Sequence, residues 1–496
     1  MKISVRKTST LSTALLAILP IAKASAQHTT PSHPDKPNIV IILADDQGYG
    51  GVNCYPHIKK IVTPNIDKLA ASGVQCMQGY TSGHLSSPTR AGLMTGKYQQ
   101  SFGFYGLSTP HVGGIPQDQK LLSEYLVENG YDTACIGKWH LGDYIRSHPN
   151  NRGFQTFFGF INGLHDYYDP LVGGSWDGVY NGLAFTLDNM EPVTEMEYST
   201  YEYTKRAVDF IQKNADHPFF LYLPYNAIHS PLQAPEELIG ELAINPQEIG
   251  KDDIGRAMTF ALDQGVGKVV ETLEQLGLRD NTIIFYLSDN GAVEYSDKWE
   301  FRGRKGSYYE GGIRVPFIVS YPAKLAKGTI YNKPVMSIDI APTVMELAGL
   351  SHADMHGVNL LPYLSGKDRT APHDVLYWST EKKSNNQVFK NEFAIRQGKW
   401  KLVSDPHFEK DYDLYDIEAD PQEKHGLKDQ YPEKYKELFG MYLNWINQMP
   451  EELANGENAR LKGMELMRKY QRNLKKSGKK VVPLSFGPHE KKKGKQ

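Results

Sequence analysis

The fold is decided by a run of apolar residues near the start of the chain, PNIVIILADD at residues 37–46. Its branched side chains follow one another without polar alternation, which predicts a strand covered on both faces. Outward from this run, strand and helix patterns alternate, so we predict an α/β fold with a mixed, mostly parallel sheet between two layers of helices. We expect further strands at 132–136, 218–223 and 282–287, and helices at 65–71, 118–129 and 257–276.

Two of these strands end in acidic residues. The first ends at Asp45 and Asp46, and the strand at 282–287 is followed by Asp289 and Asn290. Parallel sheets bind ligands at the carboxyl ends of their strands, and an oxygen-only ligand set suits a hard cation such as calcium or magnesium. The alternative is that each pair caps a helix or shapes a turn. If the two strands are neighbours, the sequence predicts a metal site.

Length and charge limit the class of protein. The chain has 496 residues, enough for more than one domain. Its 55 basic and 57 acidic residues give a net charge of −2, so the overall balance does not call for a nucleic-acid partner. We divide the chain into a large domain at 36–370, a small α+β domain at 375–470 and a basic tail at 471–496. The three cysteines allow at most one disulfide.

The N-terminus has the order of a targeting segment. Three basic residues precede the apolar run 11–22, and small residues follow at 24–26. This order predicts a cleavable signal peptide over residues 1–26 and export to the periplasm or the exterior. A buried N-terminal helix is the alternative. The run is too short to cross a bilayer, and no other stretch is long and apolar enough, so we expect no integral membrane segment in the mature chain.

A second short motif carries a hydroxyl and a guanidinium group. The segment SSPTRAGLMTG at 86–96 predicts a short helix with Ser87 as its cap and Pro88 at its first position. Ser86 would then lie at the mouth of the helix, where free amides favour an anion. Arg90, one turn further on, could face inward and neutralise that anion. The alternative is a plain capped helix on the surface.

The segment 86–96 resembles the signature of the type I sulfatases, in which a Cys or Ser at the first position is converted after translation into formylglycine. The other matching segments are 38–46, 63–67, 137–142, 229–231, 289–291 and 305–316, with 413–416 and 420–421 in the second domain. The resemblance implies an alkaline-phosphatase-like fold and, for the large domain, hydrolysis of sulfate esters. Because position 86 is Ser rather than Cys, it implies a serine-type member and a partner, the sulfatase-maturing enzyme that acts on Ser86.

The resemblance also implies the cofactors of the reaction. The hydrated aldehyde of formylglycine, a gem-diol, would be the nucleophile, since its second hydroxyl allows sulfate to be released. One calcium ion would assist it. The implied calcium ligands are Asp45, Asp46, Asp289 and Asn290.

Further roles follow from the same resemblance. Arg90 would hold the formylglycine oxyanion, and His140 would act as the base. Lys138, Lys305 and His229 would bind the sulfate oxygens, and His229, with Lys305 as the other candidate, would protonate the leaving alcohol. Taken alone, each of these lysines is typical of a solvent-exposed side chain and each histidine of a structural one.

The resemblance extends to the substrate class. It suggests a bacterial carbohydrate sulfatase acting on a sulfated hexose or N-acetylhexosamine of host or dietary glycans. His165 and Asp166 could bind sugar hydroxyls, Tyr167 or Tyr168 could stack on a ring, and Arg302 is a weaker candidate. An aromatic loop packed on the core is the alternative for this region. Two other functions stay open at this point: a phosphate or phosphonate ester hydrolase of the same superfamily, and a non-catalytic glycan-binding homologue with unmodified Ser86.

Overall fold

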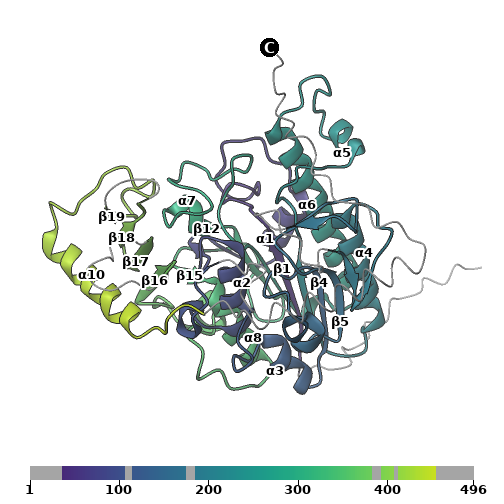
Figure 1. Ribbon diagram of the computed structural model, residues 1–496, viewed down its shortest axis with the longest axis horizontal. Coiled ribbons are helices and arrows are strands. Elements are labelled where there is room, and N and C mark those ends of the chain that lie inside the picture. Colours follow the sequence, from purple (N-terminus) through teal and green to yellow (C-terminus); the bar gives the residue numbers. More distant parts are fainter. Residues whose placement is uncertain (1–35, 107–113, 175–184, 382–391, 407–411, 454–496) are drawn as a thin grey trace, which may run out of the picture.

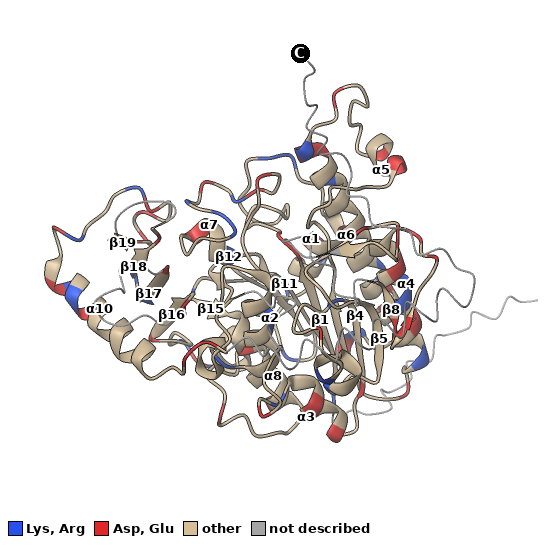
Figure 2. Cartoon of the chain, viewed as in Figure 1, with Lys and Arg blue, Asp and Glu red and all other residues tan. Residues whose placement is uncertain are grey.

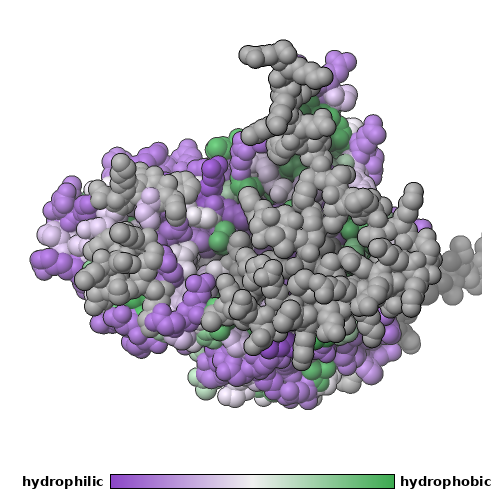
Figure 3. Space-filling model, in the orientation of Figure 1, coloured by the Kyte–Doolittle hydropathy of each residue, from purple (hydrophilic) through white to green (hydrophobic). Residues whose placement is uncertain are grey.

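The computed structural model describes residues 36–106, 114–174, 185–381, 392–406 and 412–453. The predicted signal peptide and basic tail lie outside these residues. The described chain forms a large α/β part and a smaller C-terminal part beside it (Figure 1). On the face drawn in Figure 3, hydrophilic residues predominate and apolar ones are scattered among them.

A ten-stranded sheet runs through the large part, in the order β14-β2-β13-β11-β1-β10-β4-β5-β8-β9. Its five central strands are parallel to one another, and the outermost two of them, β11 and β5, each pair with an antiparallel strand on the other side. The predicted mixed, mostly parallel sheet is therefore confirmed. The central strands are β11 (Thr282–Ser288), β1 (Asn38–Ala44), β10 (Phe219–Pro224), β4 (Asp132–Lys138) and β5 (Thr156–Phe160). The outer strands are β14 (Thr329–Tyr331), β2 (Val74–Cys76), β13 (Phe317–Ser320), β8 (Leu187–Asp188) and β9 (Glu191–Pro192).

Strand β1 shows why its sequence is apolar at every position after Asn38. Val40 and Ile42 face one hydrophobic core, whereas Ile39, Ile41 and Leu43 face the other. The first core is covered by α1 (Pro64–Ala71), α4 (Ser199–Lys213) and α6 (Lys251–Gln275), and the second by α2 (Ser86–Thr95), α3 (Leu122–Glu128) and α8 (Ile340–Leu347). Short helices α5 (Glu236–Glu241), α7 (Glu310–Ile313) and α9 (Leu361–Leu364) lie in the connections.

Two helices start at residues other than those predicted. Helix α6 begins at Lys251, before the predicted 257, because the Asp253 carboxylate accepts the Gly250 amide at 3.1 Å and caps an earlier turn. Helix α3 begins at Leu122, after the predicted 118, since Glu124 caps the Leu121 amide at 2.7 Å.

The C-terminal part is a four-stranded antiparallel sheet with one helix packed on it, as expected for a small α+β unit. Its elements are β16 (Val375–Ser379), β17 (Phe393–Gln397), β18 (Trp400–Ser404), β19 (Tyr412–Asp416) and α10 (Pro432–Asn447). Two small sheets complete the described chain, formed by β12 (Arg314–Val315), β3 (Gly79–Tyr80) and β15 (Val335–Met336), and by β6 (Leu164–His165) and β7 (Gly173–Gly174).

Among the described residues, no helix is long and apolar enough to cross a membrane. Cys54, Cys76 and Cys135 are free thiols in the structure. Burial raises the pKa of Cys54 to about 12, so this thiol stays protonated at neutral pH.

Candidate active site

The acidic ends of β1 and β11 meet, as predicted for neighbouring strands. Ala44 pairs with Ser288 in the parallel register, so the residues that follow each strand lie side by side. The Asp46 amide donates to Oδ1 of Asp289 at 3.3 Å, and the Asn290 side-chain amide donates to Oδ1 of Asp46 at 2.9 Å. All four predicted metal ligands are buried. The strand register and these hydrogen bonds show that the structure brings them together.

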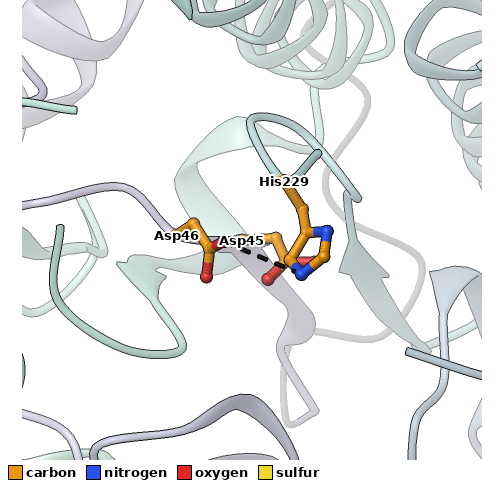
Figure 4. Close-up of side chains that lie close together, drawn as sticks. All are labelled: Asp45, Asp46 and His229. Atoms are coloured by element: carbon orange, nitrogen blue, oxygen red, sulfur yellow. Dashed lines mark ion pairs between the residues drawn. The ribbon is translucent and has the colours of Figure 1, made fainter. Parts of the chain in front are cut away.

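His229 lies against the same carboxylates. In Figure 4 its ring faces Asp45 and Asp46, and one ligand atom from each residue lies within 4.8 Å of the others. Main-chain hydrogen bonds hold the loop that carries His229 against Asp45. The Ile228 amide donates to the Asp45 carbonyl at 2.7 Å, and the Asp45 amide donates to the Ala227 carbonyl at 2.9 Å. Nε2 of His229 lies 3.8 Å from Oδ2 of Asp46. Burial and Lys305 lower the pKa of His229.

Ser86 is the first residue of α2 and is 1% exposed. Its hydroxyl lies 3.2 Å from Oδ1 of Asn290 and 3.3 Å from Oδ1 of Asp45, so it can donate to either oxygen. The predicted cap at Ser87 is wrong: Leu85, with an extended backbone, precedes the helix, and its carbonyl accepts the first helical bond from Thr89. This shift places Ser86 directly against the predicted metal ligands.

Arg90 faces the interior of the cluster. Its guanidinium donates to Oδ2 of Asp289 at 2.7 and 3.0 Å and to the Lys138 carbonyl at 2.8 Å. It also lies 3.9 Å from Asp45. Burial would lower the pKa of Arg90, but Asp289 raises it above the ordinary value, so the group is a fixed cation.

Two lysines complete the charged cluster. Nζ of Lys138 lies 2.5 Å from Asp45, and Nζ of Lys305 lies 2.5 Å from Asp46. Burial raises the carboxyl pKa values of Asp45 and Asp46, but the neighbouring cations together, led by Lys138 at Asp45 and by Lys305 at Asp46, hold them below the ordinary value. Burial lowers the pKa of Lys138, whereas at Lys305 the carboxylates of Asp46, Asp45 and Asp289 together outweigh burial and raise the pKa.

His140 follows β4 and has a left-handed backbone with φ of 57°. The ring is buried, and among the described residues its Nδ1 has no hydrogen-bond partner. Burial, Lys138 and Arg90 hold its pKa well below the ordinary value. The imidazole is therefore neutral and able to accept a proton.

The donor set fits a hard divalent cation. Three carboxylates and one amide oxygen converge in the buried cluster, and they are oxygen ligands of the kind that calcium binds. The charges of Asp45, Asp46 and Asp289 are balanced by Arg90, Lys138 and Lys305. A bound divalent cation would therefore leave the cluster positive, as an anionic sulfate ester requires.

Two of the residues predicted to bind the substrate, His165 and Asp166, already bond to other groups of the protein. His165 is 2% exposed, its Nδ1 contacts the Asp166 carbonyl at 2.7 Å, and its Nε2 lies 3.3 Å from the Thr186 hydroxyl. The Asp166 carboxylate accepts three protein N–H groups, whereas Tyr168 is 43% exposed. Direct substrate contact by His165 and Asp166 stays a prediction.

Arg302 is turned toward the C-terminal part. It donates to the Tyr415 hydroxyl at 3.1 Å and to the Glu423 carbonyl at 2.7 Å. Its guanidinium also lies 4.3 Å from the centroid of the Tyr309 ring. A contact of Arg302 with substrate therefore stays a prediction as well.

One residue near the catalytic groups has a role that sequence reasoning missed. The Tyr167 hydroxyl is buried and lies 2.6 Å from the Asn226 carbonyl and 2.8 Å from the His229 carbonyl. It thereby fixes the loop that carries His229. No local pattern could reveal this contact, because Tyr167 and His229 are 62 residues apart.

The comparisons with known proteins agree with this geometry. The Sulfatase family matches residues 37–350, and the family described as N-sulphoglucosamine sulphohydrolase, C-terminal, matches residues 301–451. Arylsulfatase J of Mus musculus is 33% identical over 457 residues, which cover 81% of this chain and 74% of that protein. N-acetylgalactosamine-6-sulfatase of Homo sapiens is 34% identical over 67% of this chain and 66% of its own length.

A comparison with solved structures also finds a carbohydrate-bound relative with the same fold. Ps i-CgsB in complex with k-i-k-neocarrahexaose has a TM-score of 0.76 at 33% identity, and the match covers 89% of this chain and all of that one. The fold class predicted from the sequence, with its large mixed sheet and small C-terminal sheet, is shared with these structures. The chain therefore belongs to the sulfatase family of sulfuric ester hydrolases.

Proposed function

We propose that this protein is an exported, calcium-dependent carbohydrate sulfatase in which Ser86 is converted to formylglycine. The observation that carries the proposal is the position of Ser86, buried and within hydrogen-bond distance of both Asp45 and Asn290. A hydroxyl that touches two members of an oxygen-ligand cluster is placed to act on a substrate bound there.

Asp45, Asp46, Asp289 and Asn290 would hold the calcium ion. When bound, the ion lowers the pKa of a coordinated hydroxyl and stabilises negative charge on the sulfate oxygens. Formylglycine supplies a hydrated aldehyde, whose second hydroxyl allows the enzyme to turn over.

Side chains of the protein would bind the sulfate group and transfer the protons. Lys138 and Lys305, now paired with Asp45 and Asp46, would bind the sulfate oxygens and orient the ester. Arg90 would keep Asp289 in place and add positive charge beneath the nucleophile. His140 would accept a proton, and His229, with Lys305 as the second candidate, would donate one to the leaving alcohol.

The substrate class rests on the relatives. Ps i-CgsB was solved with a carbohydrate, k-i-k-neocarrahexaose, and a curated relative is named for N-acetylgalactosamine 6-sulfate. These names support a sulfated sugar as the substrate here. Export is supported by the basic, apolar and small-residue order of residues 1–26.

The test is mass spectrometry of the Ser86 peptide from protein made in its native host. Conversion to formylglycine removes two hydrogens, and we expect that loss together with turnover of a panel of sulfated mono- and oligosaccharides. Unmodified serine in the native protein would exclude the formylglycine mechanism and would favour a non-catalytic glycan-binding homologue. Paired sulfate and phosphate esters, assayed with and without chelator, test the reaction class and the calcium requirement, and Ser86→Ala is the inactive control.

A further inference from the structure

His84 lies two residues before Ser86, where the large part meets the C-terminal part. Its Nε2 is 2.8 Å from Oε2 of Glu392, the residue that precedes β17. A carboxylate only accepts hydrogen bonds, so Nε2 carries the proton. The two side chains are 4% and 13% exposed, and a hydrogen bond to a carboxylate is stronger when water is kept away from it. This pair therefore holds the histidine ring against the C-terminal part.

The C-terminal sheet fixes Glu392 in turn. The Thr380 amide donates to the Glu392 carbonyl at 3.2 Å, which continues the antiparallel pairing of β16 with β17. The same sheet contacts the large part close to His84, since the Trp378 indole donates to the Thr81 carbonyl at 2.7 Å. In Figure 1, β16 is accordingly the strand of this sheet that lies nearest to α2. The Glu392 carboxylate is thus presented from a docked, hydrogen-bonded strand end.

The main chain beside His84 is bonded to the start of α2, which Ser86 opens. The Gly83 amide donates to Oγ1 of Thr89 at 3.2 Å, and the Thr89 hydroxyl donates to the Gly83 carbonyl at 3.0 Å. On the other side of His84, the Leu85 carbonyl accepts the Thr89 amide. Because the residues on both sides of His84 are bonded to the helix, a shift of His84 moves the turn that begins with Ser86.

His84 also contacts the loop that carries Lys305. This loop leads to α7, whose acidic first residue is red in Figure 2. The His84 carbonyl accepts the Gly306 amide at 3.0 Å, and the His84 ring stacks on Tyr308 with ring centroids 4.2 Å apart. Nδ1 of His84 has no hydrogen-bond partner among the residues that the structure describes, so Glu392 and Tyr308 orient the ring. One residue therefore touches both the nucleophile segment and the lysine loop.

We propose that His84 is a positioning residue of the sulfatase reaction: Glu392 holds it, and it sets the place of Ser86 relative to Lys305. The inference rests on the proposed function, which supplies the roles of Ser86 and Lys305. Attack on sulfur needs the nucleophile and the sulfate-binding lysine in a fixed geometry, and a displacement of about 1 Å can cost ~10²-fold in rate. The C-terminal part thereby takes part in catalysis, although the residues assigned to the reaction all lie in the large part.

The test breaks the pair from both sides. Glu392→Ala deletes the acceptor, whereas Glu392→Gln keeps one for Nε2. His84→Phe keeps a stacked ring but removes Nε2. Glu346→Ala is the matched control, because Glu346 also pairs with a histidine, His352, at 3.3 Å but is 56% exposed. The probe is the sulfated monosaccharide that the unsubstituted protein turns over fastest. Each rate is divided by the fraction of Ser86 that mass spectrometry finds converted.

We expect Glu392→Ala and His84→Phe to lower kcat about tenfold, with KM changed less than about threefold. Glu392→Gln and the control should keep kcat within about twofold of the unsubstituted protein. Calcium affinity, measured by titration calorimetry, should stay unchanged in every variant, because the substitutions leave the four metal ligands in place.

An unchanged kcat in Glu392→Ala, an equal loss in Glu392→Gln or a parallel loss of calcium affinity would overturn the inference. The last outcome would mean a general loosening of the site. If the unsubstituted protein turns over no sulfated sugar although Ser86 is converted, it is the proposed function that fails, and the role of His84 in it fails as well.

Discussion

The ammonium group of Lys401 lies 2.7 Å from Oε1 of Glu310, and both side chains are fully buried. Lys401 belongs to β18 in the C-terminal part, whereas Glu310 opens α7 in the large part. Glu423 lies 2.9 Å from the same ammonium and accepts the Glu310 amide at 2.7 Å. The contacts of Lys401 with Glu310 and Glu423 form one buried ionic network. It joins the two parts of the chain through a buried ionic contact.

Lys401→Met is expected to destabilise the protein strongly. It removes the cation shared by Glu310 and Glu423 and leaves Glu310 with Arg314 as its ion partner among the described residues, and breaking a buried ion pair of this kind costs about 3 kcal/mol. Denaturant unfolding followed by fluorescence measures the loss. Lys399→Met is the matched control, because Lys399 lies two residues before Lys401, just ahead of β18, is 46% exposed and pairs with Asp416, and should leave the midpoint unchanged. Equal midpoints for the two variants would contradict the role of Lys401.

Gly291→Ala is expected to weaken calcium binding. A Cβ at Gly291 would lie 2.1 Å from the Gly311 carbonyl oxygen, so the loop that carries Asn290 would have to move. We expect calcium affinity, measured by titration calorimetry, to fall at least about tenfold, or ~1.4 kcal/mol. Gly240→Ala is the control, since a Cβ there meets nothing within 4 Å. Unchanged affinity in Gly291→Ala would show that the packing of this loop does not set the metal site.

Tyr167→Phe should lower kcat more than it changes KM. The substitution leaves the ring in place but removes the hydroxyl that contacts the Asn226 and His229 carbonyls. We expect kcat to fall about tenfold and stability by ~1 kcal/mol, the usual net contribution of such a bond. Tyr431→Phe, in the C-terminal part and 45% exposed, is the control. A change confined to stability would limit Tyr167 to a structural role.

Stability should fall as the pH rises above neutral because of His373. Burial alone would lower its pKa, but the Asp339 carboxylate, 2.8 Å from Nε2, raises it above 6.5. The stabilising charge is fully present below pH 6.5 and is lost as the pH rises through the folded-state pKa. The slope of unfolding free energy against pH above 6.5 should therefore become less negative in His373→Gln. The exposed His217→Gln serves as control, and an identical slope in both variants would refute the assignment.

The central sheet could be predicted because its signal is local. The interiors of strands β1 and β11 are continuous apolar runs, since both faces are covered by helices, and parallel neighbours then bring Asp45 and Asp289 to one edge. The aromatic run at 156–160 forms β5 because its rings pack into both cores.

Other features depend on contacts between distant residues. Lys401 and Glu310 are 91 residues apart, and Arg302 and Tyr415 are 113 apart. Nothing in the neighbouring sequence encodes either pair. The start of α2 was also misplaced, because the extended backbone at Leu85 overrides the capping preference of Ser87.

If Ser86 is converted as proposed, its burial sets an order of events during biosynthesis. A side chain that is 1% exposed and enclosed between two strand ends offers no room for a second enzyme once α2 has docked on the sheet. The docking partners arrive late, since Asn290 is translated more than two hundred residues after Ser86. A modifying enzyme would therefore have its opportunity while the nascent chain is still open, and export of an unfolded chain would extend that interval.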